Sequence, residues 1–173
     1  MKEFTPKKIA SLAVMAALLV CGKLALDFIP NVEVVSLFCA LFGYVFGPCA
    51  MIPVTVFCLI SGAYWGYGLW VITYLIHFNS IVIVYFLLSK KSLNKPYITA
   101  PIICVMTFLF GITDAFLVTV MLGFDDFVYR FSAYYARGVV FVLVHIVSNT
   151  IVFTLLFGVL EKLLTRLKEK IKL

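Results

Sequence analysis

Hydrophobic residues run along almost the whole chain and are interrupted only by short polar or glycine-containing stretches. Six apolar segments can be separated, at residues 9–28, 32–46, 49–61, 69–88, 98–122 and 138–164. A helix that crosses a bilayer directly needs about 20 residues, so the second and third segments are short for separate crossings. We expect these two to form a helix pair packed inside the protein or beside a cavity, joined by a turn at Phe46-Gly47-Pro48.

Composition turns this pattern into a prediction about the protein class. Of the 173 residues, 64% are hydrophobic and 13% are charged, whereas soluble domains are about half apolar and a quarter charged. The chain is therefore predicted to be all-α, a single domain of residues 1–173 that forms an integral membrane bundle of six transmembrane helices. The basic, amphipathic residues at about 161–173 are predicted to form a tail at the cytoplasmic interface.

The distribution of positive charge predicts the orientation. With six crossings, eleven lysine and arginine residues fall on one side of the membrane. They are Lys2, Lys7, Lys8, Lys90, Lys91, Lys95, Lys162, Arg166, Lys168, Lys170 and Lys172. The positive-inside rule then places both termini in the cytoplasm. The net charge of +6 follows from topology and attraction to anionic lipid, and it requires no nucleic acid as a partner.

Polar and aromatic residues gather in the connections on the other, external side, at residues 27–31, 61–70 and 123–137. In the first, Asn31 is a good N-cap and Glu33 suits the first helical turn. Alternatively, both side chains face an external cavity and bind a polar solute. The second connection carries four aromatic side chains among glycines, Tyr64, Trp65, Tyr67 and Trp70. These form either an interfacial aromatic belt or one wall of a small-molecule pocket.

Ionisable and amide residues inside the apolar segments are further candidates. Asp114 lies midway through the fifth segment, where a charge costs roughly 2.5–3.5 kcal/mol on insertion. It is either functional or bonded to a structural partner such as His145. His145 and Asn149 are four residues apart and share one helical face. His77 and Asn79 either bond a neighbouring helix or line the same site.

Two more patterns have a structural and a functional interpretation. The third connection combines aromatic and charged residues, of which Tyr129, Arg130, Tyr135 and Arg137 are candidate ligand contacts. It is either a solvated surface helix or a lid over a bound solute. On the first segment, Ala13 and Ala17 form a small-xxx-small pattern that permits close helix approach. This face serves internal packing or docking to another membrane subunit.

The order of these features resembles the substrate-binding S components of energy-coupling factor (ECF) vitamin transporters, which occur in bacterial plasma membranes. The resemblance rests on six apolar segments, the Ala13-xxx-Ala17 pattern, Ile-Pro-Asn-Val-Glu at residues 29–33, the Phe-Gly-Pro turn, and the aromatic external side. It implies that the external loops and outer helix halves enclose a vitamin, with cobalamin favoured and riboflavin its nearest rival. It also implies that Ala13 and Ala17 meet a transmembrane coupling subunit, that two partner ATPases supply energy, and that the chain has no permanent cofactor.

The sequence contains no Walker A motif, no nucleophile elbow and no zinc-protease motif. We therefore predict neither catalytic residues nor metal ligands, and expect a transport subunit rather than an enzyme. Two alternatives from other classes stay open. One is a small intramembrane enzyme that uses Asp114, and the other is an accessory membrane subunit that binds no ligand.

Overall fold

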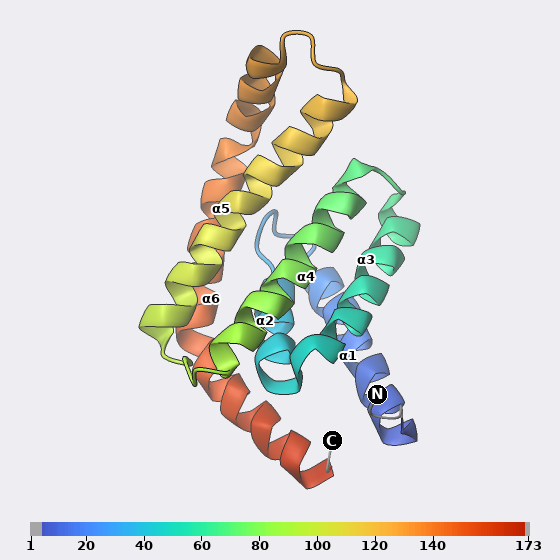
Figure 1. Ribbon diagram of the computed structural model, residues 1–173, viewed down its shortest axis with the longest axis vertical. Helices are drawn as coiled ribbons and strands as arrows, with labels where there is room; N and C mark the ends of the chain where they lie inside the picture. Colours follow the sequence, from blue (N-terminus) through green and yellow to red (C-terminus); the bar gives the residue numbers. More distant parts are fainter. Residues whose placement is uncertain (1–4, 172–173) are drawn as a thin grey trace.

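The structure, a computed structural model, describes residues 5–171, and this range is almost entirely helical with no β-strand (Figure 1). The elements are α1 (Pro6–Ala25), α2 (Val35–Phe46), the 3-10 turn η1 (Gly47–Ala50), α3 (Met51–Trp65), α4 (Leu69–Ser89), α5 (Pro96–Met121) and α6 (Phe127–Ile171). The predicted all-α class is confirmed. Lys2, Lys172 and Leu173, which entered the orientation and tail predictions, lie outside the described residues.

Five helical segments of the described chain are long and apolar enough to cross a membrane. They are Pro6–Ala25, Val35–Trp65, Leu69–Ser89, Pro96–Met121 and Phe127–Ile171. The second of these contains α2, η1 and α3 together, since α2 has 12 residues and α3 has 15. Both fall short of the roughly 20 residues that a direct crossing needs. A membrane protein with five such segments is therefore supported, and separate crossings by α2 and α3 stay a prediction.

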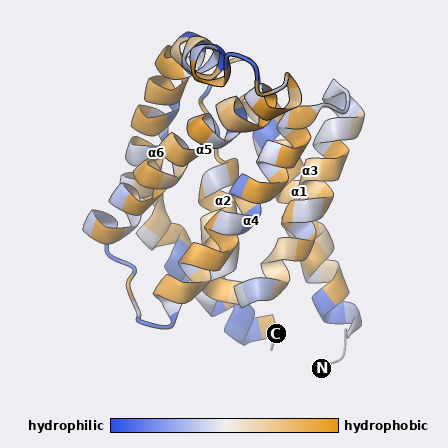
Figure 2. Cartoon of the chain, turned by 45° about the horizontal axis from the view of Figure 1, so that its top comes forward, coloured by the Kyte–Doolittle hydropathy of each residue, from blue (hydrophilic) through white to orange (hydrophobic). Residues whose placement is uncertain are grey.

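The helices form two antiparallel pairs around a central helix (Figure 1). One pair is α5 and α6, the other is α3 and α4, and α2 packs against both α4 and α6 while α1 covers α3. Both described ends of the chain and the α4–α5 connection lie at one end of the bundle, and the α3–α4 and α5–α6 connections lie at the opposite end. Most of the lysine-bearing segments therefore share one end, whereas Lys23 lies in the last turn of α1, at the other end. Hydrophobic residues make up much of the helices (Figure 2).

Helix α2 forms the centre of the core. Six of its hydrophobic side chains are exposed by 1% or less: Val35, Leu37, Cys39, Ala40, Leu41 and Phe42. A Cβ atom on Gly43 would lie 2.8 Å from the Cα of Val82, so glycine permits direct contact between the α2 and α4 backbones. The prediction of a helix packed inside protein is confirmed for α2. Helix α3 is only half buried, because Ile52, Val56 and Leu59 on its outer face are exposed, so for α3 the alternative of a position beside a cavity stays a prediction.

Helix α6 starts eleven residues earlier than the predicted segment 138–164, because Phe127 is its first residue. Residues 127–137 were predicted as part of a connection, but three of their rings stack along one face at a spacing of four residues. The centroids of Phe127 and Phe131 are 6.2 Å apart, and those of Phe131 and Tyr135 are 6.1 Å apart. Aromatic contacts at this spacing stabilise a helix. Residues 127–137, predicted as either a surface helix or a lid, are therefore the first three turns of α6.

The same helix continues without interruption through the predicted tail as far as Ile171. In its last turns the ammonium group of Lys168 donates a hydrogen bond of 2.6 Å to the carbonyl oxygen of Val45. It also lies 5.9 Å from the ring centroid of Phe46. A cation at this position satisfies one of the free carbonyl groups that end a helix and complements the helix dipole. The tail is thus attached to the C-terminal end of α2 rather than separate from the bundle.

Candidate functional site

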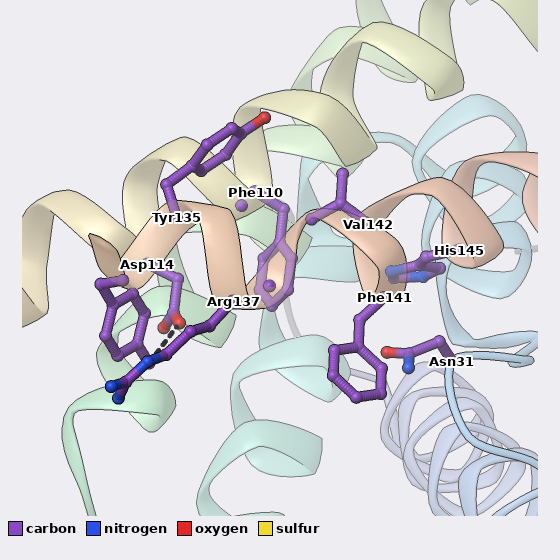
Figure 3. A pocket seen from close by; sticks show the side chains of 11 residues that line it. Asn31, Phe110, Asp114, Tyr135, Arg137, Phe141, Val142 and His145 are labelled. Carbon is purple, nitrogen blue, oxygen red and sulfur yellow. Dashed lines mark hydrogen bonds between the residues drawn. The ribbon is translucent and has the colours of Figure 1, made fainter. Parts of the chain in front are cut away.

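A cavity of about 370 Å³ lies between α5, α6 and the α1–α2 connection (Figure 3). Its walls are formed by Asn31, Phe110, Gly111, Asp114, Tyr134, Tyr135, Arg137, Gly138, Phe141, Val142 and His145. Five of the predicted site residues are among them: Asn31, Asp114, Tyr135, Arg137 and His145. The cavity lies in the half of the bundle away from the chain ends, because its α5 residues approach the α5–α6 connection and its α6 residues follow it.

One polar end of the cavity is built on a buried carboxylate–imidazole pair. Nε2 of His145 lies 3.0 Å from Oε1 of Glu33, and Oε2 of Glu33 accepts a hydrogen bond of 2.8 Å from the backbone N–H of Ser36. Burial raises the pKa of the Glu33 carboxyl, but the hydrogen bonds from His145 and Ser36 outweigh this effect and hold the pKa below its ordinary value. This contact is a hydrogen bond to a charged group when Glu33 is a carboxylate and the His145 ring carries its proton on Nε2.

The predicted N-cap at Asn31 is wrong, because α2 begins four residues later. Val34 occupies the cap position and has no capping side chain, and the Glu33 carboxylate satisfies the Ser36 N–H instead. Asn31 has a φ of 60°, in the left-handed region that asparagine tolerates better than most residues. The turn at this point places the Asn31 side chain at the wall of the cavity (Figure 3).

The other polar end is formed by Asp114, whose two carboxylate oxygens are held by different helices. Oδ1 accepts a hydrogen bond of 3.0 Å from the hydroxyl of Thr73 on α4. Oδ2 accepts one of 3.1 Å from the phenol of Tyr134 on α6, the dashed line in Figure 3. Arg137 lines the same cavity and adds a positive charge. A solute at this end would therefore meet an oriented carboxylate, a phenol and a guanidinium group.

The wall between the two polar ends is apolar and aromatic. Phe110 on α5 and Phe141 on α6 contribute their rings, and Phe110 also makes an edge contact with His145 at a centroid distance of 6.2 Å. A Cβ atom on Gly111 would lie only 2.7 Å from a methyl carbon of Val142. Glycine at this position therefore lets α5 and α6 approach closely beside the cavity.

The aromatic connection between α3 and α4 does not line this cavity. Tyr64 and Tyr67 are largely exposed, and the Tyr67 phenol folds back to the carbonyl oxygen of Leu59 at 3.0 Å. Trp65 and Trp70 line a separate, smaller cavity of about 210 Å³, together with Lys23, Asp27 and Tyr74. The four aromatic residues are thus divided between the surface and this second hollow.

Two more predicted residues on α4 and one on α6 do not line the cavity. His77 and Asn149 are buried and Asn79 is half-buried, and all three bond or pack within the protein. The ring of His77 lies against Phe110 at a centroid distance of 4.8 Å, one layer away from the wall. Asn79 donates to the carbonyl oxygen of Leu75 at 2.9 Å. Asn149 donates to the hydroxyl of Thr107 at 3.0 Å. These contacts correspond to the structural alternative that the sequence left open.

Two predicted residues near the start of α6 point away from the cavity. Tyr129 is 77% exposed, and the guanidinium group of Arg130 donates to the carbonyl oxygen of Leu122 at 2.7 Å. The helix spacing explains the division, because residues 134, 138, 141 and 145 recur every three or four positions and share one face. The stripe includes Tyr134, a wall residue that was not predicted. Its spacing would have pointed to Tyr134 if a helix had been assumed to start at Phe127.

On the outside of the bundle, Ala13 and Ala17 are both exposed on α1, so they do not serve packing within this chain. Among residues 5–171, no group of three or more histidine, cysteine, aspartate or glutamate side chains is placed to hold a metal ion. Comparison of the chain with protein-family models, with curated proteins and with solved structures found no match. The chemistry of the cavity is therefore the basis on which we infer a function.

Proposed function

We propose that this chain is a membrane-embedded solute-binding subunit of the S-component type, which captures a vitamin for an ECF importer. The observation that carries the proposal is the cavity, with its two polar ends joined by an aromatic wall. Internal hydrogen bonds hold Asp114 and His145 before any solute arrives. Such preorganisation lowers the entropic cost of binding. The chain itself is not catalytic in this proposal, and partner ATPases hydrolyse ATP.

The volume of the cavity limits the size of the vitamin that it can hold. A volume of about 370 Å³ is near the lower limit of the roughly 300–1,000 Å³ typical of small-molecule pockets. A flat heterocycle fits beside Phe110 and Phe141, with its polar groups directed to Asp114 and His145. We therefore place a compact vitamin such as riboflavin ahead of cobalamin, whose macrocycle would require α5 and α6 to move apart.

Two features of the bundle surface agree with this proposal. Most of the lysine-bearing segments, all but the end of α1 with Lys23, gather at the end opposite the cavity, so the positive-inside rule directs the cavity to the outside of a bacterial cell. Ala13 and Ala17 present small side chains on the exposed face of α1. Small residues let a second membrane helix approach closely, and a transmembrane coupling subunit is the proposed partner.

The test is a binding screen on the purified chain, with riboflavin and cobalamin among the vitamins and bound ligand measured by mass spectrometry and calorimetry. Asp114→Asn should weaken binding about 10- to 100-fold, since a hydrogen bond to a charged group contributes roughly 1.5–3 kcal/mol. Asp125→Asn is the matched control, because Asp125 is an exposed carboxylate in the α5–α6 connection. It should bind as the unmodified chain does.

Three outcomes would contradict the proposal. If no vitamin binds at high micromolar concentration, the cavity is not a vitamin site. If Asp125→Asn weakens binding as much as Asp114→Asn does, general charge rather than the cavity is responsible. If the purified chain converts a substrate and Asp114→Asn abolishes the turnover while the fold is kept, the protein is an intramembrane enzyme instead.

A further inference from the structure

A third hollow, of about 640 Å³, lies at the opposite end of the bundle from the cavity, and we call it the basic groove. One wall is the start of α5 and the residues before it, and the other is a single stripe of α6. The lining residues are Asn94, Lys95, Pro96, Thr154, Leu155, Gly158, Val159, Lys162, Leu163 and Arg166. The groove shares no residue with the cavity, and the proposed function makes no use of it.

Charge is distributed unevenly along the basic groove. Lys95, Lys162 and Arg166 lie toward the end nearest the C-terminus, and none of them is in an ion pair within residues 5–171. The neighbouring carboxylate of Glu161 is buried, and its oxygens accept hydrogen bonds from Asn94 at 3.5 Å and Thr165 at 3.2 Å. The groove therefore carries three positive charges without a carboxylate partner.

The start of α5 adds to the attraction for an anion. Its N-cap, Lys95, makes no capping hydrogen bond through its side chain, and its first turn contains no acidic residue. The positive end of the helix dipole is thus uncompensated at the same place as the three cations.

The other part of the basic groove is apolar. Leu155 and Val159 are 66% and 67% exposed, and a Cβ atom on Gly158 would meet no atom within 4 Å. The missing side chain leaves an open channel between them. From Thr154 to Arg166 the stripe is about 18 Å long at 1.5 Å per residue. Charge at one end and a narrow apolar channel beyond it match the head group and acyl chain of one phospholipid.

We propose that the basic groove is a binding site for an anionic phospholipid. The phosphate lies among Lys95, Lys162 and Arg166, and one acyl chain follows α6 past Gly158. Cation clusters beside membrane helices attract anionic head groups, and the channel gives this attraction a fixed location. The lipid adds a second link between the start of α5 and the second half of α6, beside the hydrogen bond from Asn94 to Glu161.

The test titrates the full-length chain in detergent with phosphatidylglycerol, phosphatidylcholine or inorganic phosphate, and native mass spectrometry counts the bound molecules. In the charge variant, Lys95, Lys162 and Arg166 are all replaced by glutamine. In the control variant, Lys7, Lys91 and Lys170 are replaced by glutamine; all three are exposed, and all are at the same end of the bundle but outside the groove. The two variants lose the same charge.

We expect one phosphatidylglycerol molecule to bind the unmodified chain in preference to phosphatidylcholine. The charge variant should lose about 100-fold in affinity, at roughly fivefold for each cation near a membrane surface. The control variant should change by less than about fivefold. Gly158→Leu should weaken phosphatidylglycerol binding without changing the charge, and leucine is a better helix former than glycine, so the fold is retained.

Each contrary result identifies another explanation for the charge and shape of the groove. Equal losses in the charge and control variants mean general attraction to the membrane surface, not a site. Unchanged binding in Gly158→Leu, or equally tight binding of inorganic phosphate, means a phosphate site without an acyl chain. If no lipid binds and the charge variant instead loses a co-purifying membrane subunit, the groove is a protein interface.

Discussion

Replacing Glu33 by alanine tests the central polar contact of this bundle. Glu33 is 7% exposed, and its carboxylate bonds both the His145 ring at 3.0 Å and the Ser36 N–H at 2.8 Å. Each hydrogen bond to a charged group contributes roughly 1.5–3 kcal/mol. Removing one partner of a buried pair costs about 3–5 kcal/mol in general, because the other is left unsatisfied. We expect Glu33→Ala to lower the free energy of unfolding by this amount.

The measurement is the free energy of unfolding in mixed micelles, followed by the helical circular dichroism signal during titration with dodecyl sulfate. Asp27→Ala is the control, because Asp27 forms a more exposed pair with Lys23 at 3.2 Å. Losing an exposed pair at this spacing should cost only about 0.3–0.5 kcal/mol. His145→Ala and the double variant complete a thermodynamic cycle, in which contacting residues typically couple by about 0.5–3 kcal/mol. A loss under about 1 kcal/mol for Glu33→Ala, or strict additivity in the cycle, would mean that the contact between Glu33 and His145 does not stabilise the bundle.

Three further predictions use the same assay or simple pull-down. Gly43→Ala should destabilise the chain by about 1–3 kcal/mol, because its Cβ would contact the Val82 backbone, and an equal effect of Gly158→Ala, where nothing lies within 4 Å, would contradict this. Ala13→Leu should abolish co-purification with a coupling subunit yet leave vitamin binding by the isolated chain intact; loss of both means a misfolded helix. The difference in free energy of unfolding between the unmodified chain and Glu33→Gln should be constant above pH 4.5 and shrink as the pH falls through the lower pKa of folded Glu33. If this difference instead grows as the pH falls, the pKa of Glu33 is raised by folding and not lowered.

The sequence was sufficient for the fold class because hydrophobic content and segment length are local properties. It left the start of α6 undecided, because residues 123–137 were interpreted as a connection that holds either a surface helix or a lid, and not as part of the last long helix. The stacking of Phe127 on Phe131 stabilises a helix there, and that contact becomes readable only after the helix is assumed. The prediction of an N-cap at Asn31 was wrong for a related reason, because the Glu33 carboxylate accepts the hydrogen bond from the first turn of α2 instead.

The candidate site was partly predictable because an ionisable residue in an apolar segment is costly and therefore conspicuous, as Asp114 and His145 were. Their partners were not predictable. Thr73 and Asp114 are 41 residues apart and Glu33 and His145 are 112 apart, so finding them requires knowing which helices are neighbours. The possible role of the aromatic residues between α3 and α4 as a wall of the same pocket could not be judged for the same reason. Composition gave their chemistry, but not the face of the bundle on which they lie.

The attachment of α2 to α6 has a consequence for how the protein is made. Two polar contacts at the ends of α2 come from the last helix of the chain: His145 bonds Glu33, just before α2, and Lys168 bonds Val45 in its last turn. At about 5–20 residues per second, the 112 residues between Glu33 and His145 take roughly 6–22 seconds to synthesise. Until then the Glu33 side chain has neither an imidazole partner nor a closed core, and it must stay in water or carry a proton. The contacts of the most buried helix of the bundle are therefore completed last. A ribosome that stalls before α6 leaves a membrane intermediate in which the Glu33 carboxyl group has no imidazole partner.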